Sequence, residues 1–552
     1  MLRPSPIGPV PDATARVARA AFPKGHPYLT LADELGTLFS DDQFATLFAS
    51  RGQPALAPWR LVLVSILQFA EGLSDRQAAD AVRGRLDWKY VLRLELSDAG
   101  FDASVLSEFR TRLRGGAPEY LLLDTLLDWC RQHQLLKTRG HQRTDSTHVL
   151  AAVRALNRLA VVLEVMRHAL DSLAIVAPAW LVALSPEEWT ERYARRADEG
   201  RLPEGKERRA ELAQVIGADG HALLDASEGP DAPAWLRELP ALAILRRVWV
   251  QNFYVQEGRL QWRTQELGIP PAARYISSPY DLDAHLAKKR STQWVGYKLH
   301  LTETCDEDLP SLITHVETSA GPVADGAATP RVHAALAQRD RLPGVHIVDT
   351  GYLDAALLVS SRADYQVDLL GPTRADYHWQ ARKATGFAVE HFRVDWERRE
   401  ATCPAGHTSI SWTPAVDKRT NEVIKVKFST TDCGPCPSRE LCTRSTKQSP
   451  RRTITVRREA EYQALQAARG RAGTEDFVKT YAKRAGIEGT ISRAVRRTRL
   501  RRTRYIGEAR VHLGHLLGAV ALNFLRLGEW LTGAPRAKTR HTAFVRLMAA
   551  AD

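Results

Sequence analysis

The chain has 552 residues, of which 44% are hydrophobic and 26% charged, and its formal net charge is +13 at pH 7. Such an apolar fraction is sufficient for sizeable cores and excludes a wholly disordered chain. The excess of positive charge favours a polyanionic partner, of which nucleic acid is the commonest.

Neither the start of the chain nor its most apolar stretch indicates a membrane protein. The first residues, MLRPSPIGPVPDATARV, lack the apolar segment of a secretory signal. The apolar run at 173–184 contains Pro178 and is shorter than the roughly 20 residues that span a bilayer, so we expect a core helix there. Six cysteines in a chain of this length do not form a disulfide scaffold, and we expect a cytoplasmic protein.

The N-terminal part of the sequence predicts a small all-helical domain behind a disordered tail. Residues 1–27 are rich in proline and alanine, and helical patterns follow over 28–120. Ser74 is a predicted N-cap, and Gln77 three residues later has the spacing of a capping box. The stretch FDASVLSEFRTRL carries an apolar residue every four positions, at Val105, Phe109 and Leu113.

Downstream, strand and helix patterns alternate in an order typical of an α/β sheet. The strand pattern HQRTDSTHVL is followed by a long helical insert at about 153–280. Further strands are predicted in WVGYKLHLTET, LITHVETSA, VHIVDTGYL and YQVDLLGP, and helices in DGAATPRVHAALAQRD and DAALLVSS. Two helices, at about 470–497 and 508–532, close the core, which we assign to 138–384 and 465–535. Without its inserts this is a compact sheet with three leading strands and alternating crossovers.

A β-rich insert at 385–460 holds most of the cysteines. A tight chelating turn and a Cys-Pro-x-Gly turn resemble the two halves of a zinc ribbon, and they contain Cys403, Cys433, Cys436 and Cys442. Four thiolates suit a tetrahedral structural Zn²⁺, with His407 as a reserve ligand. The alternative is four reduced thiols without a metal. Residues 536–552 form a basic C-terminal tail.

Two aspartates occupy positions in the predicted sheet where sites are built. Asp145 lies in the first strand pattern, and Asp349 ends an apolar strand. A carboxylate leaving an apolar strand needs a partner or a metal, and strand ends are where open sheets form sites. Asp349 could instead cap a helix, but Asp354 is better placed for that role.

A third carboxylate, Glu488, lies on a basic helix. Tyr481, Arg484 and Glu488 have the spacing Y-x2-R-x3-E and therefore share one helical face. Arg484 can brace Glu488 or contact a phosphate, and Tyr481 offers a hydroxyl and a stacking surface. Three carboxylates from two strands and a helix can hold two divalent ions, and oxygen ligands favour Mg²⁺ or Mn²⁺. The plainer alternative for Glu488 is an ordinary salt bridge.

Basic residues surround this candidate site. Seven arginines lie between 493 and 504, among them Arg496 and Arg497, and few acids accompany them. A charge run is often only a solvated face, but this one adjoins the proposed metal site, so we favour contact with phosphates. Lys298 and His300, on the polar face of a predicted strand, could line the same groove, although His300 could equally be a surface histidine.

These motifs together resemble the DDE transposases of bacterial insertion sequences, in the group with a Y-x2-R-x3-E-x6-K signature. The resemblance is carried by LSDRQAAD, FDASVLSEFRTRL, TDST, GYKLHLTET, VDTGY and YAKRAGIEGTISRA. The chain departs from the signature at its lysine, where Val495 is followed by two arginines.

The resemblance implies an RNase H-like core in which Asp145, Asp349 and Glu488 bind two Mg²⁺ or Mn²⁺ ions. It further implies a nucleoid-associated bacterial enzyme that binds the terminal inverted repeats of its own element as a dimer in a synapse. Such an enzyme cuts double-stranded DNA at the element ends and joins the 3′-OH to target DNA. The helical domain at 28–120 is then a candidate for DNA-end binding. The alternatives are a nuclease of the same fold without strand transfer and an inactive DNA-binding descendant of a transposase.

Overall fold

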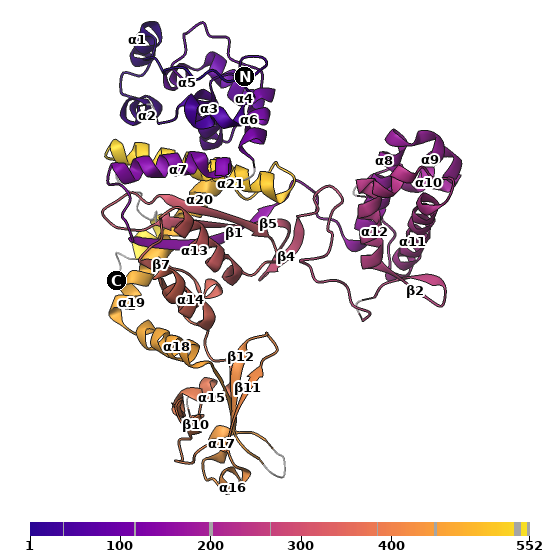
Figure 1. The fold of residues 1–552 in the computed structure, drawn as a ribbon, viewed down its shortest axis with the longest axis vertical. Helices are drawn as coiled ribbons and strands as arrows, with labels where there is room; N and C mark the ends of the chain where they lie inside the picture. The colour runs from indigo at the N-terminus through magenta and orange to yellow at the C-terminus, as the bar shows by residue number, and fades with distance from the viewer. Residues whose placement is uncertain are drawn as a thin grey trace.

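The computed structural model describes residues 1–36, 38–114, 117–197, 202–264, 266–383, 385–445, 450–534 and 542–548. Figure 1 shows a helical N-terminal part at the top, a central sheet covered by helices, a helical lobe to one side and a cysteine-containing lobe at the bottom. The two lobes extend away from the sheet, so the central region alone brings together the two strands and the late helix discussed above.

The N-terminal part is helical, with elements α1 (Asp12–Ala21), α2 (Pro27–Leu35), η1 (Asp41–Leu47), α3 (Pro58–Glu71), α4 (Asp75–Gly84), α5 (Leu86–Val91), α6 (Ser104–Leu113) and α7 (Ala117–Gln132). Ser74 caps α4 and Gln77 completes the predicted capping box. Helix α6 buries Phe109 and Leu113 of the predicted stripe, but Leu106 replaces Val105 as its third buried apolar residue.

The prediction of a disordered tail over 1–27 is wrong for helix α1. Ala18 is fully buried, and the hydroxyl of Thr14 donates to the carbonyl of Leu94 at 2.7 Å. Ala18 packs in a small apolar cluster with Leu29 and Tyr90. Tertiary packing thus orders a segment whose composition alone indicated disorder.

The central sheet has six strands, β1 (His141–Leu150), β4 (His285–Lys289), β5 (Thr292–Thr304), β6 (Ile313–Ala320), β7 (Val345–Ile347) and β8 (Asp368–Leu370). Their order is β4-β5-β1-β7-β8, and β6 also pairs with β5. Strand β5 runs antiparallel to both β1 and β6, whereas β7 pairs parallel with β1 and β8 parallel with β7. Strand β4, which forms a hairpin with β5, was not predicted.

Helices α13 (Ala328–Gln338), α14 (Ala355–Tyr365), α20 (Gly486–Thr498) and α21 (Glu508–Leu531) pack around the sheet. Among the described helices, only α21 is long and apolar enough to cross a membrane, and 78% of that apolar window is buried inside the protein. Helix α21 lies between β6 and the N-terminal helices α2, α3 and α7. Its hydrophobicity is therefore explained by packing in the core.

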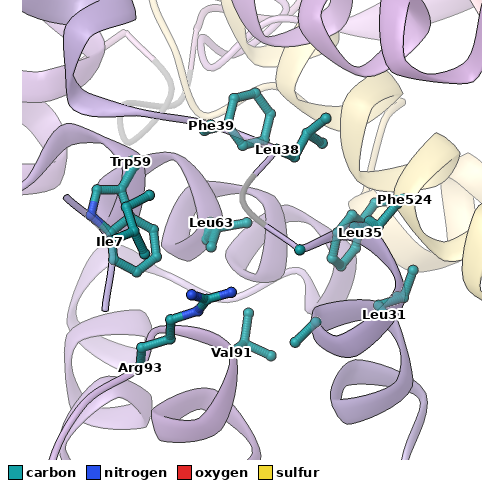
Figure 2. A pocket seen from close by; sticks show the side chains of 12 residues that line it. Ile7, Leu31, Leu35, Leu38, Phe39, Trp59, Leu63, Val91, Arg93 and Phe524 are labelled. Carbon is teal, nitrogen blue, oxygen red and sulfur yellow. The ribbon is translucent and has the colours of Figure 1, made fainter. Parts of the chain in front are cut away.

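A small cavity of about 20 Å³ remains where α21 meets the N-terminal helices (Figure 2). Phe524 of α21 lines it together with Leu31, Leu35 and Trp59, and the figure shows the guanidinium of Arg93 at one side. Such a volume holds about one water molecule, so we interpret the cavity as a packing gap and not as a ligand site.

The segment between β1 and β4 folds into a lobe with its own core, built from α8 (Arg158–Val176), α9 (Pro178–Leu184), α10 (Glu187–Tyr193), α11 (Lys206–Glu228), η2 (Ala234–Glu238), α12 (Pro240–Asn252) and the hairpin β2 (Phe253–Gln256) and β3 (Arg259–Trp262). The prediction of one core helix at 173–184 is wrong, because the helix breaks before Pro178, whose ring disrupts a helix interior. Ile175 and Val182 are exposed at 81% and 78%.

The cysteine-containing lobe begins with α15 (Trp379–Arg382) and η5 (Val389–His391). Its other elements are β9 (Arg393–Asp395), β10 (Glu400–Thr402), β11 (Ser411–Val416), β12 (Glu422–Lys427), α16 (Thr430–Cys433), α17 (Arg439–Cys442) and β13 (Thr453–Arg457). Strands β11, β12 and β13 form a sheet over a small core that contains Phe392 and Phe428.

The predicted helix at 470–497 is instead divided into α18 (Glu459–Ala472), α19 (Glu475–Ala482), η6 (Lys483–Ala485) and α20. Thr474 causes the first break, because its side chain caps α19. In the predicted basic tail, α22 (Ala543–Met548) is helical, and residues 536–541 and 549–552 lie outside the described residues.

Candidate active site

The three predicted carboxylates come from three elements of the core. Asp145 lies on β1, Asp349 follows β7 and caps the turn η4 (Thr350–Tyr352), and Glu488 lies in the first turn of α20. The guanidinium of Arg484 connects the strand to the helix. Its Nη2 donates to Asp145 Oδ2 at 2.9 Å and its Nη1 to Glu488 Oε1 at 3.0 Å.

The surroundings of Asp145 disfavour the ionised form of its carboxyl group. The residue is 9% exposed, and burial raises the pKa of its carboxyl, with a further contribution from the negative charge of Asp349. The Ser146 N–H, 2.7 Å from Oδ1, and the charge of Arg484 act in the opposite direction. A positive charge beside Asp145 is therefore needed to keep it ionised at this position.

Asp349 makes a local hydrogen bond as well as facing the site. Its Oδ1 accepts from the Gly351 N–H at 2.7 Å, while Asp354 caps α14 by accepting from the Leu357 N–H at 2.9 Å. Both aspartates are therefore caps, whereas the sequence favours that role for Asp354 alone. The charge of Asp349 still reaches Asp145, which places the two side chains in one electrostatic neighbourhood.

Tyr481 and Glu488 complete the group at its open side. Burial raises the pKa of Tyr481, and the charges of Asp145, Asp349 and Glu488 raise it further, whereas Arg484 lowers it. The tyrosine ring stacks on Phe477 with the ring centroids 5.6 Å apart. The side chain of Glu488 is 65% exposed, so it is accessible to a large substrate.

A buried ionic cluster fixes α20 against the sheet. Glu303 on β5 is fully buried and accepts hydrogen bonds from Arg143 Nε at 2.8 Å, the Thr490 hydroxyl at 2.7 Å and Arg526 at 2.8 Å. Burial alone would raise the pKa of Glu303, but Arg526 and Arg143 hold it below its usual value. Arg143 also donates to the carbonyl of Lys483, next to Arg484.

The sequence did not reveal a second polar network beside Asp145. Asp325, in the turn η3 (Asp325–Ala327), lies 3.4 Å from the Ser146 hydroxyl and accepts from Lys298 Nζ at 2.9 Å. Burial lowers the pKa of His300 to about 4, and its Nδ1 is hydrogen-bonded to the Tyr352 hydroxyl at 2.6 Å. In the sequence, the only signal of Asp325 as a partner is its position at the start of the predicted helix DGAATPRVHAA.

Two predictions for the basic residues are corrected by their placement. The Lys298 side chain is 10% exposed and paired with Asp325, so it does not line an open groove. His300 is 1% exposed, so it is neither a surface histidine nor a groove residue. Strand β5 is covered by other elements along this part of its length, and its alternating pattern does not mark a solvent face.

Arg496 and Arg497 are exposed on α20, as a contact with DNA requires. Val495, at the position of the signature's lysine, packs instead against the main hydrophobic core. Elsewhere in the basic run, Arg493 pairs with Glu529 at 2.6 Å and Arg501 donates to the Thr147 hydroxyl at 2.9 Å. Only part of this charge is therefore available to a ligand.

The four predicted zinc ligands come together in the bottom lobe. Cys403, Cys433, Cys436 and Cys442 line one small pocket, and His407 lies at the same pocket. Burial raises the pKa of the Cys442 thiol to about 11, and the other three thiols add to this effect. Within the described part of the chain, no three His, Cys, Asp or Glu side chains form a group that could already hold a metal ion.

Comparison with known families adds two matches. A family described as a transposase DDE domain matches residues 402–528, which include all four clustered cysteines and the whole of α20. A second family, described as a transposase domain (DUF772), matches residues 16–112, from within α1 to α6. No curated protein matches the sequence.

Proposed function

Since both family matches make the chain a DDE-type transposase of an insertion sequence, we propose that Asp145, Asp349 and Glu488 form its catalytic triad. A DDE domain implies an RNase H-like core, and the order of three antiparallel strands followed by two parallel ones agrees with it. The observation that carries the proposal is the pairing of Arg484 with both Asp145 and Glu488, which places the strand carboxylate beside the helix carboxylate.

The residues of the triad fit divalent cations. All three offer oxygen ligands only, the donor type that Mg²⁺ and Mn²⁺ prefer. The guanidinium of Arg484 already lies as a positive charge between two of them. Two bound ions would activate the attacking oxygen and stabilise the leaving oxygen of a phosphoryl transfer.

The protein's own groups would prepare the site for that chemistry. Arg484 would keep Asp145 ionised and contact a phosphate oxygen once the carboxylates are otherwise neutralised. Tyr481, whose pKa the charges of all three carboxylates raise, would orient the DNA strand through its hydroxyl. Arg496 and Arg497 would bind the backbone from the exposed face of α20.

The reaction that we propose is cleavage at both ends of a mobile element, followed by attack of the 3′-OH on target DNA. The partners are the terminal inverted repeats, the target duplex and a second copy of the chain in a synaptic complex. The enzyme would act in the bacterial cytoplasm at the nucleoid. Asp325, held by Lys298, would support the strand that carries Asp145 through the Ser146 hydroxyl.

For the lobe at 385–460 we propose a structural zinc-ribbon-like site. Cys403, Cys433, Cys436 and Cys442 share one pocket, and a lobe with so small a core benefits from a metal crosslink. Metal analysis of purified protein tests this, since Cys436→Ser should remove about one zinc ion per chain.

Strand transfer with pre-cleaved element ends and a target plasmid tests the catalytic assignment. Asp145→Asn, Asp349→Asn and Glu488→Gln should each abolish joined products while leaving end binding nearly unchanged. Asp354→Asn is a matched control, because it removes a carboxylate charge near the site, keeps the cap of α14 and does not touch the triad. Joined products from any triad variant would refute the assignment. Cleavage by the wild type without joining would favour the nuclease alternative.

A further inference from the structure

A basic pocket lies between helix α6 of the N-terminal part and the start of α21. Its volume is about 320 Å³, and none of the described residues that line it is acidic. Four arginines line it, two at the C-terminal end of α6 and two around the start of α21, namely Arg110, Arg114, Arg504 and Arg510. The side chains of Ser107, Thr111 and Tyr505 add hydroxyl groups.

The wall of this pocket contains buried donors that have no partner. Arg110 is 8% exposed, and its Nη2 donates to Asp75 Oδ2 at 2.5 Å. Its Nη1 is buried and has no hydrogen-bond partner among the described residues, and the same is true of the Tyr505 hydroxyl. An unpaired buried donor costs about 1–3 kcal/mol, more when charged, so two on one pocket wall indicate a ligand with acceptor oxygens.

The other three arginines of the pocket differ in whether they already have partners in the protein. Neither Arg114 nor Arg510 forms an ion pair with any residue that the structure describes, and both are exposed. Arg504 donates to the carbonyl of Leu73 at 3.0 Å, and its guanidinium lies 5.7 Å from the centre of the Tyr505 ring. The Tyr505 ring in turn packs on Gly514, where a Cβ atom would lie 2.8 Å from it.

We propose that this pocket binds a backbone phosphate of the element-end duplex and so positions the DNA for the catalytic triad. This inference rests on the proposed function. Arginine forks match the oxygens of a phosphodiester, and the pocket supplies those of Arg114 and Arg510 together with the unpaired Nη1 of Arg110.

Two features favour duplex DNA over a small free anion. The pocket is open to solvent along exposed side chains, which suits a polymer that passes across it. The chain just before it is also tied to the catalytic strand, because the Leu150 N–H donates to the Arg501 carbonyl at 2.8 Å and the Thr503 N–H to the Leu150 carbonyl at 3.1 Å. A phosphate held here is therefore at a fixed distance from Asp145 on the same strand.

The pocket also depends on both matched regions of the chain. Arg110 and Arg114 lie in the N-terminal part of the chain. Arg504 and Arg510 lie within the match to the DDE domain. It exists only when these two parts are packed together, so DNA bound in it contacts both parts at once.

The test measures binding of an element-end duplex to the full chain as a function of salt concentration. The double variant Arg114→Gln with Arg510→Gln should weaken binding about tenfold or more, and the salt slope should fall by about 0.9 for each lost phosphate contact. Both residues are exposed, so the fold should survive the change. The control is Arg208→Gln, an exposed arginine on α11 of the helical lobe, together with a second lobe variant, Arg247→Gln, to match the charge removed.

The outcomes separate this inference from the proposed function. An unchanged salt slope in the double variant would refute backbone-phosphate binding in the pocket. An equal loss of DNA affinity in the control variant would refute it as well. Inorganic phosphate that stabilises the wild type but not the double variant, with DNA binding unchanged, would also overturn it in favour of a small anion. Asp145→Asn should keep full DNA affinity, so its loss of activity would not contradict phosphate binding in the pocket. A negative result for the pocket likewise would not contradict the assignment of the triad.

Discussion

A methyl group added at Gly486 should loosen helix α20, because Arg143 already fills the space beside it. A Cβ atom at this position would lie 2.2 Å from Arg143 Nη1 and 2.5 Å from Nη2, whereas ordinary contacts begin at 3.4 Å. The guanidinium would therefore have to retreat by about 1 Å, since overlap of this size cannot be absorbed by close-packed atoms.

That displacement costs free energy because two nitrogens of the Arg143 guanidinium are hydrogen-bonded. It donates to the carbonyl of Lys483 and, through Nε, to Glu303 at 2.8 Å. Losing one hydrogen bond to a charged group costs about 1.5–3 kcal/mol. The higher helix propensity of alanine offsets up to about 1 kcal/mol of this cost. Gly486→Ala should therefore lower the free energy of unfolding by about 1–2 kcal/mol.

Gly489 on the same helix provides the matched control. No atom lies within 4 Å of a Cβ built there, so Gly489→Ala should gain only the helix propensity, about 0.5–1 kcal/mol. Urea denaturation of the two variants should therefore differ by about 2 kcal/mol. Strand transfer by Gly486→Ala should also fall, because the displaced Lys483 carbonyl is next to Arg484. Equal free energies of unfolding would refute this account of the cluster.

Three further predictions concern other parts of the fold. Glu303→Gln should cost about 3–5 kcal/mol in urea denaturation, because two buried arginines including Arg526 lose their counter-charge, and a loss below about 1 kcal/mol would contradict this. Burial holds the pKa of His512 at about 4 and that of His515 at about 3, below the ordinary 6.5. The unfolded chain therefore binds more protons in this range, and the urea midpoint should fall as the pH drops from 6.5 towards 4, whereas a constant midpoint would argue against it. Removing zinc with a chelator, or by Cys436→Ser, should change the tryptophan fluorescence of the lobe at 385–460; an unchanged spectrum would count against a structural metal.

The sequence was sufficient for the features that depend on local pattern. The capping box at Ser74 and the cap at Asp354 are local chemistry, and the structure has both. The spacing of Tyr481, Arg484 and Glu488 set them on one side of a helical segment, although the chain there is divided between α19, η6 and α20. Patterns of period 2 and 3.6 carry this information without any knowledge of long-range contacts.

Features that depend on long-range packing could not be read in the same way. Glu303 and Arg143 look like surface charges in the sequence, yet they form a buried ion pair between β5 and β1. Lys298 alternates with apolar neighbours as a solvent-facing residue would, but the structure covers it and gives it Asp325 as a partner. Such a pairing depends on which segments lie opposite each other, and no single segment contains that information.

The position of α21 has a consequence for how the protein is made. This helix packs against α2 and α3, which are translated long before it, and Phe524 closes the gap that Figure 2 shows. At roughly 5–20 residues per second, a ribosome needs roughly 20–90 s to go from the end of α3 to the start of α21. During that interval the surfaces of α2, α3 and α7 that α21 later covers lack that partner.

The nascent chain should therefore depend on chaperones until α21 emerges, and the order of synthesis delays assembly of the site. Glu488 and α21 are produced after both aspartates, so the three carboxylates meet only when nearly all of the fold is present. Fragments that end before α21 would expose the α2 and α3 surfaces and be removed by proteolysis. The enzyme thus becomes able to act on DNA only after synthesis of its core is complete.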